Sequence, residues 1–559
     1  MKTTWVSITG LSLTFLVAAC SSTTSPTGTG AAGAGPGAAG AGTGAAGAGT
    51  GTAGAGTGTA GAGTGTAGTG TGTAGAGTGT AGAGTGTAGA GGTPGAAGDA
   101  GNAAGSGNVA GSTSAPLPRL VTSAANAYWK TDGMLTEVTT GTADVTVNDA
   151  SGAQTWEGFG GAFNEMGWKY LMTLSEADRT AALKLLFGDD GARFNMGRIP
   201  MGASDYAIAR YTLDETAGDT AMASFSIDHD KTYLLPYVKA AMAIRPNIRF
   251  WASPWTPPTW MKTGQKSGNV PSPFDGGTMK TDDTTLAAHA QYFVKFVQQY
   301  GAEGIKIIAV APQNEPNFDQ NYPSCLWGTD TFVKFVGKFL GPAMMTASPD
   351  TAIMLGTMSN GDKDPAIVTA VLADATAKSF IKMIGLQWGM SDHIASAKPS
   401  GLPMWQTEHK CGNYPWMGGY QSTAPNDQAY AVESWGLIRD WIKGGVTSYS
   451  AWNMVLDKAG KGIDTTRDWA QDALMFVDGG KLTITPAYYV FRHLSQYVEP
   501  GAKLVATTGG DALAFKNPNG KIVTVLYNSG AAKTAIVSAG GKMVSFAMPG
   551  AGWATVTTQ

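Results

Sequence analysis

Two glutamates in this sequence each follow a short apolar segment. Residues 305–311 form an apolar run that leads into Asn314-Glu315-Pro316, and residues 403–407 lead into Glu408. A buried parallel strand reads as a near-continuous apolar run, and a proline ends a strand because it has no N–H for the sheet. We therefore expect both carboxylates at the carboxyl ends of parallel strands, where barrel enzymes carry their reactive groups.

The spacing of the two glutamates fits one particular fold. Glu315 and Glu408 are 93 residues apart. A (β/α)8 barrel uses about 250 residues, or about 31 per unit, so 93 residues correspond to three units. This spacing predicts the glutamates on strands four and seven. Two carboxylates on one rim can act as acid/base and as nucleophile, or as base to a water, in glycoside hydrolysis. A solvated loop residue or an ion-pair partner is the alternative for a single glutamate.

The chain begins with features of an export signal. Lys2 precedes an apolar run at residues 5–19, which is shorter than the roughly 20 residues of a membrane span. Residues 17–20, Val-Ala-Ala-Cys, resemble a bacterial lipobox, in which Cys20 would be lipidated and become the new N-terminus. An ordinary secretory signal over residues 1–20 is the alternative. Both predict export, either as a bacterial lipoprotein at the outer membrane or cell surface or as a secreted protein.

Residues 21–117 consist mainly of Gly, Ala and Thr. No charged residue occurs between Lys2 and Asp99. Such a segment cannot bury enough apolar surface to offset the entropy of ordering it, and glycine lacks the strict triplet period of collagen. We expect a disordered linker with a reach of roughly 50–60 Å. A tether for a catalytic domain and a spacer without a role are both compatible with this composition.

The rest of the chain reads as alternating strands and helices followed by short strands. We expect an α/β fold, a (β/α)8 TIM barrel over residues 156–498, with strands that include residues 195–200, 248–253, 352–356, 381–388 and 447–453. The expected helices cover residues 175–187, 233–243, 284–300, 330–345, 365–377, 427–443 and 486–497. Short alternating segments in residues 499–559 predict an antiparallel β-sandwich. Strands in residues 118–155 would complete it, so both ends of the folded region would build that domain.

Composition limits the partners. The net charge of −3 leaves no basic surface for nucleic acid. Membrane contact is expected only through the N-terminal lipid anchor, and we expect a monomer. Cys325 and Cys411 follow the two glutamates closely, so in an oxidising compartment they form either a disulfide between rim loops or two free thiols. The loop at residues 254–262 contains three prolines and two tryptophans, which predicts a rigid carbohydrate contact or a hydrophobic lid.

Taken together, six segments resemble glycoside hydrolase family 30, which includes glucosylceramidase, endo-β-1,6-glucanase and some xylan-active enzymes. They occur in family order at residues 158–162 (Gly-Phe-Gly-Gly-Ala), 198–206, 252–262, 314–316, 407–408 and 452–453. The resemblance implies a (β/α)8 barrel with an attached β-sandwich, a retaining mechanism, and no metal or cofactor. The expected substrate is a carbohydrate polymer or glycoconjugate, with β-linked glucosides or glucans first and xylan as an alternative.

The resemblance also assigns roles to residues. Glu315 would be the acid/base and Glu408 the nucleophile, with the two carboxyl groups about 5 Å apart and the charge on Glu408 raising the pKa of Glu315. Asn314 would hydrogen-bond the sugar 2-hydroxyl, and Arg198 would lie beneath the nucleophile and keep it ionised. The remaining sugar contacts would come from Asp205, Trp255, Trp388 and Trp452.

One position departs from the family pattern. Gln387-Trp388-Gly389 stands where glucosylceramidase-like members carry an aromatic run such as His-Trp-Tyr. The family tyrosine that touches the nucleophile therefore falls on Gly389. Substrate orientation and specificity are the properties that this departure affects, whereas the glutamate pair is retained.

Other classes of protein find less support in the residues. The histidines show no metal-binding spacing such as HExxH, and there is no G-x-S-x-G nucleophile elbow. The histidines are His229, His289, His393, His409 and His493. A thiol nucleophile at Cys411 beside His409 would lack an orienting group, so we expect His409 to be a hydrogen-bonding loop residue. The remaining rival is a non-catalytic surface lipoprotein that binds glycan, and retention of both glutamates with Asn314 argues against it.

Overall fold

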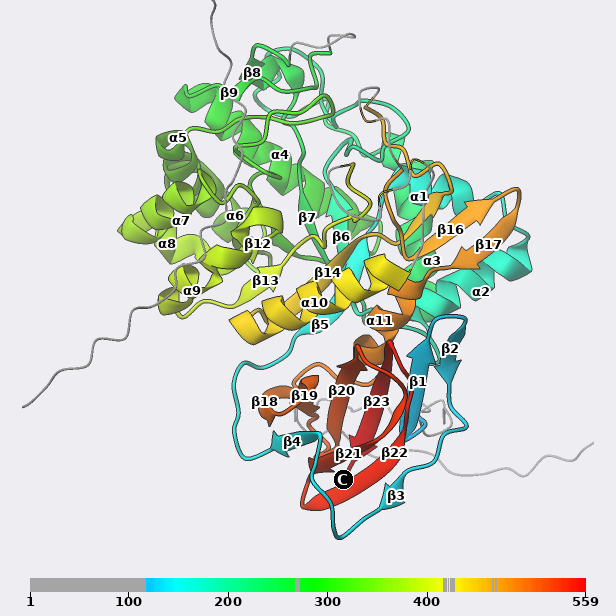
Figure 1. The fold of residues 1–559 in the computed structure, drawn as a ribbon. Helices are drawn as coiled ribbons and strands as arrows, with labels where there is room; N and C mark the ends of the chain where they lie inside the picture. The colour runs from blue at the N-terminus through cyan, green and yellow to red at the C-terminus, as the bar shows by residue number, and fades with distance from the viewer. Residues whose placement is uncertain are drawn as a thin grey trace, which may run out of the picture. The chain divides into compact units, whose positions relative to one another are not determined.

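The computed structural model describes residues 117–266, 272–415, 420, 422, 428–464, 467 and 470–559. The predicted signal segment with Cys20, and the linker up to residue 116, lie outside the described residues. Within them, a closed parallel barrel is surrounded by helices and followed by a β-sandwich (Figure 1).

The barrel has eight parallel strands in chain order, and the last strand pairs with the first. This closure confirms the predicted (β/α)8 fold. Glu315 follows the fourth strand and Glu408 the seventh, as their spacing predicted. The strands are β5 (Gly158–Ala162), β6 (Met196–Pro200), β7 (Arg249–Ser253), β10 (Ile307–Val310), β11 (Ala352–Met358), β12 (Ile381–Leu386), β13 (Met404–Gln406) and β14 (Ser448–Asn453).

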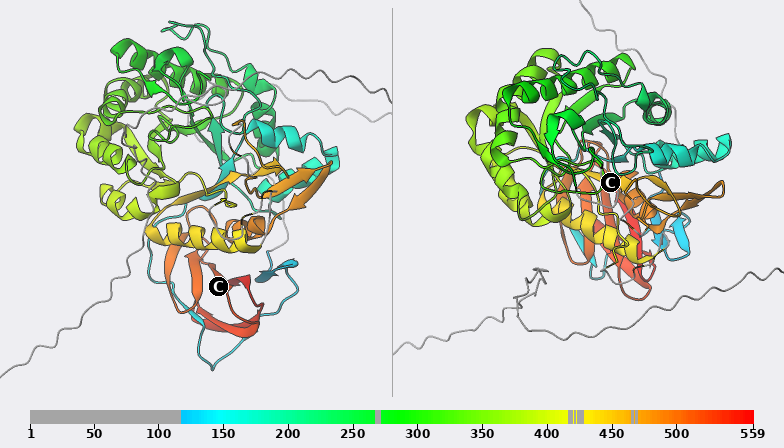
Figure 2. Two further views of the ribbon diagram at one scale, coloured as in Figure 1. Left: turned by 45° about the horizontal axis from the view of Figure 1, so that its top comes forward. Right: turned by 90° about the horizontal axis from the view of Figure 1, so that it is seen from above.

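Helices lie outside these strands, as the view along the barrel shows (Figure 2, right). Ser175 begins the second helix as predicted, because its hydroxyl accepts the Asp178 N–H at 3.1 Å. The α-helices are α1 (Glu165–Leu171), α2 (Glu176–Phe187), α3 (Leu234–Ile244), α4 (Asp283–Ala302), α5 (Thr329–Lys334), α6 (Gly341–Ala347), α7 (Asp364–Ala373), α8 (Ala375–Phe380), α9 (Ile394–Ala397), α10 (Gln428–Gly444) and α11 (Pro486–Ser495). The 3-10 helices are η1 (His229–Lys231), η2 (Thr259–Met261), η4 (Trp388–His393) and η5 (Lys398–Ser400).

Several elements differ from the sequence predictions. The helix expected over residues 330–345 is interrupted by a π-helical segment, η3 (Phe335–Leu340), just before Pro342, which has no N–H to continue the α-helical pattern. The helix expected over residues 365–377 divides at Asp374, whose side chain caps α8. Short elements of the rim loops were not predicted: α1, the ribbon β8 (Lys262–Thr263) with β9 (Thr278–Met279), and the sheet β15 (Val455–Asp457), β16 (Met475–Asp478) and β17 (Lys481–Ile484).

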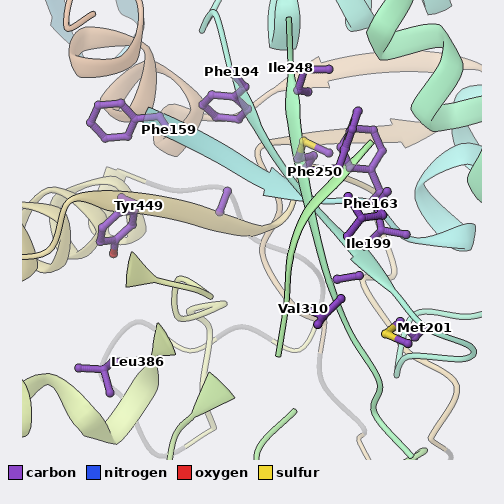
Figure 3. Close-up of a cluster of buried hydrophobic side chains, with 14 of the residues drawn as sticks. Phe159, Phe163, Phe194, Ile199, Met201, Ile248, Phe250, Val310, Leu386 and Tyr449 are labelled. Carbon is purple, nitrogen blue, oxygen red and sulfur yellow. The ribbon is translucent and has the colours of Figure 1, made fainter. Parts of the chain in front are cut away.

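The barrel strands are buried on both faces. Trp251 belongs to a small cluster with Met196, Ala309, Met354 and Trp405, which come from different barrel strands and fill the interior. Its neighbours Phe250 and Ala252 belong instead to the large core under the helices, part of which is drawn in Figure 3. Alternate residues of a strand point to opposite faces, so one apolar strand serves both layers.

Ten strands form the sandwich domain, and they come from both ends of the folded region. Strand β1 pairs along its length with β23, and β4 lies between β18 and β21. This arrangement confirms the predicted contribution of residues before the barrel. The strands are β1 (Leu120–Ala124), β2 (Ala127–Lys130), β3 (Thr136–Glu137), β4 (Val145–Asn148), β18 (Lys503–Thr508), β19 (Asp511–Lys516), β20 (Ile522–Asn528), β21 (Lys533–Ala539), β22 (Lys542–Met548) and β23 (Gly552–Thr558).

A buried histidine joins the last barrel helix to this sandwich. His493 of α11 contacts the Thr555 hydroxyl through Nδ1 and the Ser123 hydroxyl through Nε2, both at 2.8 Å. Burial lowers the pKa of His493 to about 3, so the ring is neutral near pH 7. Among the described residues, no helix is long and apolar enough to cross a membrane.

Candidate active site

One cavity at the carboxyl ends of the barrel strands receives both glutamates. Its volume is about 350 Å3, and its wall combines carboxylates, amides and aromatic rings. This combination is typical of sites that bind sugars, because rings pack against sugar faces while polar groups bind hydroxyls. The lining residues are Asp205, Trp255, Asn314, Glu315, Phe318, Gln320, Tyr322, Ser359, Asn360, Trp388, Glu408, Cys411, Tyr414, Trp452, Arg467 and Gln471.

The Glu408 carboxylate is held by two donors. Arg198 Nη1 donates to Glu408 Oε2 at 2.5 Å, and the Trp388 indole N–H donates to Oε1 at 2.8 Å. Both interactions are hydrogen bonds to a charged acceptor, the stronger class. They fix the direction of both oxygens of this carboxylate.

Arg198 is buried completely beneath the cavity on β6. Its guanidinium lies over the ring of Trp255, with the central carbon 4.3 Å from the ring centroid. Its Nη2 donates to Asn314 Oδ1 at 2.6 Å and to Ser253 Oγ at 3.1 Å. One cation thus connects the residue before Glu315 with the Glu408 carboxylate.

Glu315 occupies a different electrostatic environment. Burial, followed by the nearby Glu408, raises the pKa of Glu315 to about 8. An amide donates to its side chain, because Gln387 Nε2 donates to Glu315 Oε1 at 3.2 Å. Thr407 fixes that amide by donating its hydroxyl hydrogen to Gln387 Oε1 at 2.9 Å. The protonated form of Glu315 therefore dominates at neutral pH.

The backbone places Glu315 and Asn314 where the strand ends. Glu315 has a φ of 51°, a left-handed conformation that costs free energy in a non-glycine residue and is concentrated at functional sites. Asn314 Oδ1 accepts hydrogen bonds from Arg198 and from the Thr357 hydroxyl, the latter at 2.9 Å. The side-chain oxygen of Asn314 is therefore occupied by these two donors, which leaves the side-chain NH2 group to donate toward the cavity.

Asp205 forms a second charged part of the wall. Burial raises the pKa of Asp205 to about 6, although Arg467 Nη2 donates to its Oδ2 at 3.2 Å and opposes this shift. Its other oxygen, Oδ1, is buried without a hydrogen-bond partner among the described residues. An acceptor in this state is suited to a hydroxyl of a bound sugar.

Aromatic rings form the apolar part of the cavity wall. Trp255 and Trp452 stack with their centroids 5.6 Å apart and an angle of 20° between their planes. Phe318, three residues after Glu315, is 43 % exposed at the cavity, which is unusual for so large an apolar side chain. Flat rings of this kind can pack against the apolar faces of sugar rings.

The cavity contains most of the residues that the sequence singled out. Asp205, Trp255, Asn314, Glu315, Trp388, Glu408 and Trp452 line it, and Arg198 lies directly behind it. Arg467, Thr357 and the orienting amide of Gln387 were missed as site residues. Thr357 and Gln387 could have been found from their positions at the ends of β11 and β12, whereas no pattern in the sequence pointed to Arg467.

The possible disulfide is not formed. Cys325 and Cys411 are both free, buried thiols. Cys325 packs in the large core under the helices, whereas Cys411 lies in the aromatic cluster at the cavity, so their surroundings separate them. Two free thiols were the other alternative left open by the sequence. His409 contacts the Tyr449 and Ser434 hydroxyls, as expected for a hydrogen-bonding residue.

The geometry joins a carboxylate that two donors hold with a protonated carboxyl group across a single cavity. A carboxylate oxygen held in a fixed direction can attack an electrophilic carbon. A buried carboxylic acid with a pKa near 8 can donate a proton to a leaving oxygen at neutral pH. The two groups together are the pair that glycoside hydrolysis requires.

Comparisons with known proteins agree with this site. Residues 156–498 match the glycosyl hydrolase family 30 TIM-barrel domain, and residues 501–556 match the family 30 β-sandwich domain. The chain therefore belongs to glycoside hydrolase family 30. The structure and the family membership both support hydrolysis of O-glycosidic bonds.

Glucosylceramidases and endo-1,6-β-glucanases both occur among the proteins that this chain is similar to. A putative glucosylceramidase 1 of Caenorhabditis elegans is 26 % identical over 412 residues, covering 70 % of this chain and 77 % of the relative. An endo-1,6-β-D-glucanase of Aspergillus fumigatus is 26 % identical over 419 residues, covering 69 % and 82 %. The solved structure of an endo-β1,6-glucanase, BT3312, superposes with a TM-score of 0.68 at 27 % identity, covering 78 % of this chain and 98 % of that one.

Proposed function

We propose that this protein is a retaining β-glycoside hydrolase that cleaves β-linked glucosides or glucans by double displacement. The observation that carries the proposal is the pairing of Glu315, with its raised pKa, and Glu408, held by Arg198 and Trp388, in one cavity. Their environments divide the roles of proton donor and nucleophile between two chemically identical side chains.

In the first step, a Glu408 oxygen attacks the anomeric carbon of the sugar. The bond from that carbon to the leaving oxygen breaks, and Glu315 gives its proton to this oxygen. The product is a sugar ester of Glu408. In the second step Glu315, now ionised, takes a proton from water, and the hydroxide displaces Glu408 from the same carbon. Two inversions at one carbon retain its configuration.

The other cavity residues would bind and orient the sugar. The free NH2 of Asn314 is placed to donate to the 2-hydroxyl beside the reacting carbon, and Asp205 Oδ1 is placed to accept from a more distant hydroxyl. Trp255 and Trp452 would pack against the ring. Each of these contacts can strengthen as the sugar changes shape toward the transition state.

Among possible substrates, β-1,6-glucan is the one that we propose first. Some similar proteins are named endo-1,6-β-glucanases and others glucosylceramidases, and both names support a β-glucoside as the substrate. The cavity wall includes the polar residues Gln320, Ser359 and Asn360 as well as Phe318. Their side-chain hydroxyl and amide groups can bind the hydroxyls of a second sugar as leaving group. The same chemistry would serve glucosylceramide, which is therefore a necessary arm of the test.

We further propose that the chain is exported and anchored by a lipid on Cys20, with residues 21–117 as a tether. The support is the lipobox-like sequence and the composition of residues 21–117. Cys20→Ser should move the protein from the membrane fraction to the soluble fraction without lowering activity on a soluble aryl glucoside. Retention of the variant in the membrane fraction would contradict the anchor.

The direct test of the function is sugar release from a panel of substrates. Wild type and Glu408→Gln are compared on β-1,6-glucan, β-1,3-glucan, xylan and glucosylceramide. We expect release from β-1,6-glucan by wild type and a loss of at least about 1,000-fold in the variant. Unchanged release by Glu408→Gln would contradict the assigned nucleophile. Glycan binding without release from any substrate would favour the alternative of a non-catalytic surface lipoprotein that binds glycan.

A further inference from the structure

The segment after β12 departs from the family pattern and yet contacts the nucleophile. The resemblance places a tyrosine that touches the nucleophile at residue 389, where this chain has glycine. The structure instead brings the indole N–H of Trp388 to 2.8 Å from Glu408 Oε1. We propose that Trp388 is the positioning residue for the nucleophile in this protein, replacing the tyrosine of its relatives. This inference rests on the double-displacement function proposed above.

Close packing explains why residue 389 cannot carry the contact. A Cβ atom built on Gly389 would lie 2.9 Å from the Ser359 carbonyl oxygen and 3.3 Å from the Gly361 nitrogen. The Gly389 N–H also donates to that Ser359 carbonyl at 3.0 Å, which holds the backbone close to the end of β11. A tyrosine at this position would require the two strand ends to move apart. The hydrogen-bond donor must therefore come from another residue.

The backbone of Trp388 is set for this purpose. Its φ of 48° is left-handed, which is uncommon for a bulky residue and costs free energy. The flanking N–H groups of Gln387 and Gly389 donate to the Met358 and Ser359 carbonyls, so both sides of Trp388 are fixed. The Trp388 ring also meets the Tyr414 ring edge-on at a centroid distance of 6.0 Å. These constraints determine where the indole N–H points.

Two donors from different strands then hold the carboxylate. Arg198 of β6 binds Oε2, and Trp388 after β12 binds Oε1. The terminal torsion of a glutamate has broad minima, so without both donors the oxygens can rotate away from the anomeric carbon. Precise placement of the attacking atom contributes strongly to rate, and this contribution appears in the bond-forming step rather than in substrate affinity.

Replacing a phenol by an indole changes the chemistry of this contact. A phenol can donate, accept and ionise, whereas an indole N–H only donates. Trp388 therefore cannot lose its proton to Glu408 or to the substrate at any working pH. After the first step the carbonyl oxygen of the glycosyl ester can still accept this N–H, so the same contact orients the ester for attack by water.

The experiment measures formation of the glycosyl–enzyme in the full chain. A 2,4-dinitrophenyl 2-deoxy-2-fluoro-β-glucoside traps the intermediate, and mass spectrometry of the labelled peptide identifies the attachment site. The variants are Trp388→Phe and replacement of Trp388 by benzothienylalanine, which keeps the ring shape but exchanges the N–H for sulfur. Trp441→Phe on α10, a buried tryptophan away from the cavity, is the control, and thermal unfolding checks that each protein is folded.

We expect the limiting rate of labelling to fall about 10- to 100-fold in both Trp388 variants, the loss expected for a hydrogen bond to a charged group. The concentration of probe for half-maximal rate should change less than about threefold, and the Trp441 variant should match wild type. A labelling rate within twofold of wild type in the benzothienylalanine variant would overturn the inference. The inference would also be overturned if the probe concentration for half-maximal rate changed while the limiting rate of labelling did not. Failure of wild type to be labelled at Glu408 would instead overturn the proposed function and, with it, the inference.

Discussion

At the scale of single residues, the site separates two glutamates by their surroundings. Glu408 is bound by a buried guanidinium and an indole, whereas Glu315 is bound by an amide and has a pKa raised to about 8 by burial and by Glu408. The role of each glutamate follows from its neighbours rather than from its own chemistry. The sequence located both glutamates from strand ends and spacing. It placed Trp388 at the site, and the position of Gln387 after β12 could have placed that residue there too. Which glutamate each of them contacts depends on side-chain directions, which the sequence does not show.

The raised pKa of Glu315 predicts the alkaline side of the pH profile. As pH rises through about 8, Glu315 loses the proton that the leaving oxygen needs, so kcat/KM should fall above that pH. The measurement is kcat/KM between pH 5 and pH 10 on a substrate with a poor leaving group. Glu315→Gln should remove this limb of the profile along with most of the activity. A decline centred near pH 5 would contradict the protonated state assigned to Glu315.

The same residue predicts a gain in stability on substitution. The carboxyl is protonated in the folded protein up to about pH 8 but ionises near pH 4.5 when unfolded, so stability falls as pH rises across this window. Glu315→Gln should remove that loss, and its Tm relative to wild type should increase between pH 4.5 and pH 8. Calorimetry of both proteins at these two pH values measures the difference. A Tm difference independent of pH would show that burial does not disfavour the ionised form.

Leaving-group chemistry separates the two glutamates. Dinitrophenolate leaves without a proton, whereas the leaving oxygen of a glucan needs one. The activity of Glu315→Gln on glucan should therefore fall about 100- to 10,000-fold, and the rate of its first step with 2,4-dinitrophenyl β-glucoside should fall far less. Glu408→Gln should lose activity on both substrates. Release of dinitrophenol in a rapid-mixing experiment measures the first step. Equal losses of the Glu315 variant on both substrates would argue against proton donation by Glu315.

At the scale of elements, the barrel depends on close backbone contact between neighbouring strands. The apolar runs, the helix periodicity and Ser175 were sufficient to predict most barrel strands and helices. The π-helical interruption at η3 and the sheet β15–β17 were not predictable, because they arise from tertiary packing and from a loop without a periodic pattern. Arg467, which pairs with Asp205, was not predicted either, because no pattern in the sequence pointed to it.

Gly160 in β5 tests the strand packing. A Cβ atom at this position would lie 2.0 Å from the Met196 carbonyl oxygen of β6, a contact that requires the strands to separate. Gly160→Ala should therefore lower the free energy of unfolding by about 1–3 kcal/mol or more. Gly301→Ala in α4, where nothing lies within 4 Å of the added atom, is the matched control and should raise it by up to about 1 kcal/mol. Chemical denaturation of both variants measures the effect, and equal stability would refute the packing argument.

At the scale of the whole molecule, the sandwich uses strands from both ends of the folded region and is bonded to the barrel through α11. The sequence predicted this origin, since short alternating strands occur before and after the barrel. It did not predict that His493 would bind Ser123 and Thr555, residues from opposite ends of the folded region. That contact depends on strand register, which places β1 beside β23.

The His493 contact predicts a pH-dependent contribution to stability. The pKa of His493 is about 3 in the folded protein but near its usual value of about 6.5 when unfolded, so the stability contributed by the neutral ring is present above pH 6.5 and is lost as pH falls toward 3. His493→Gln should cost about 1–3 kcal/mol at pH 7 and progressively less below pH 6. Unfolding measured between pH 4 and pH 8 follows the difference. A constant difference would contradict a neutral buried imidazole.

The central claim of double displacement is tested most directly by the configuration of the first sugar released. A β-linked gluco-oligosaccharide is hydrolysed in an NMR tube, and the anomeric proton signals are followed before mutarotation begins. We expect the β-anomer to appear first, because two successive inversions at one carbon restore its configuration. First appearance of the α-anomer would mean a single displacement by water, and Glu408 would then be a base rather than the nucleophile.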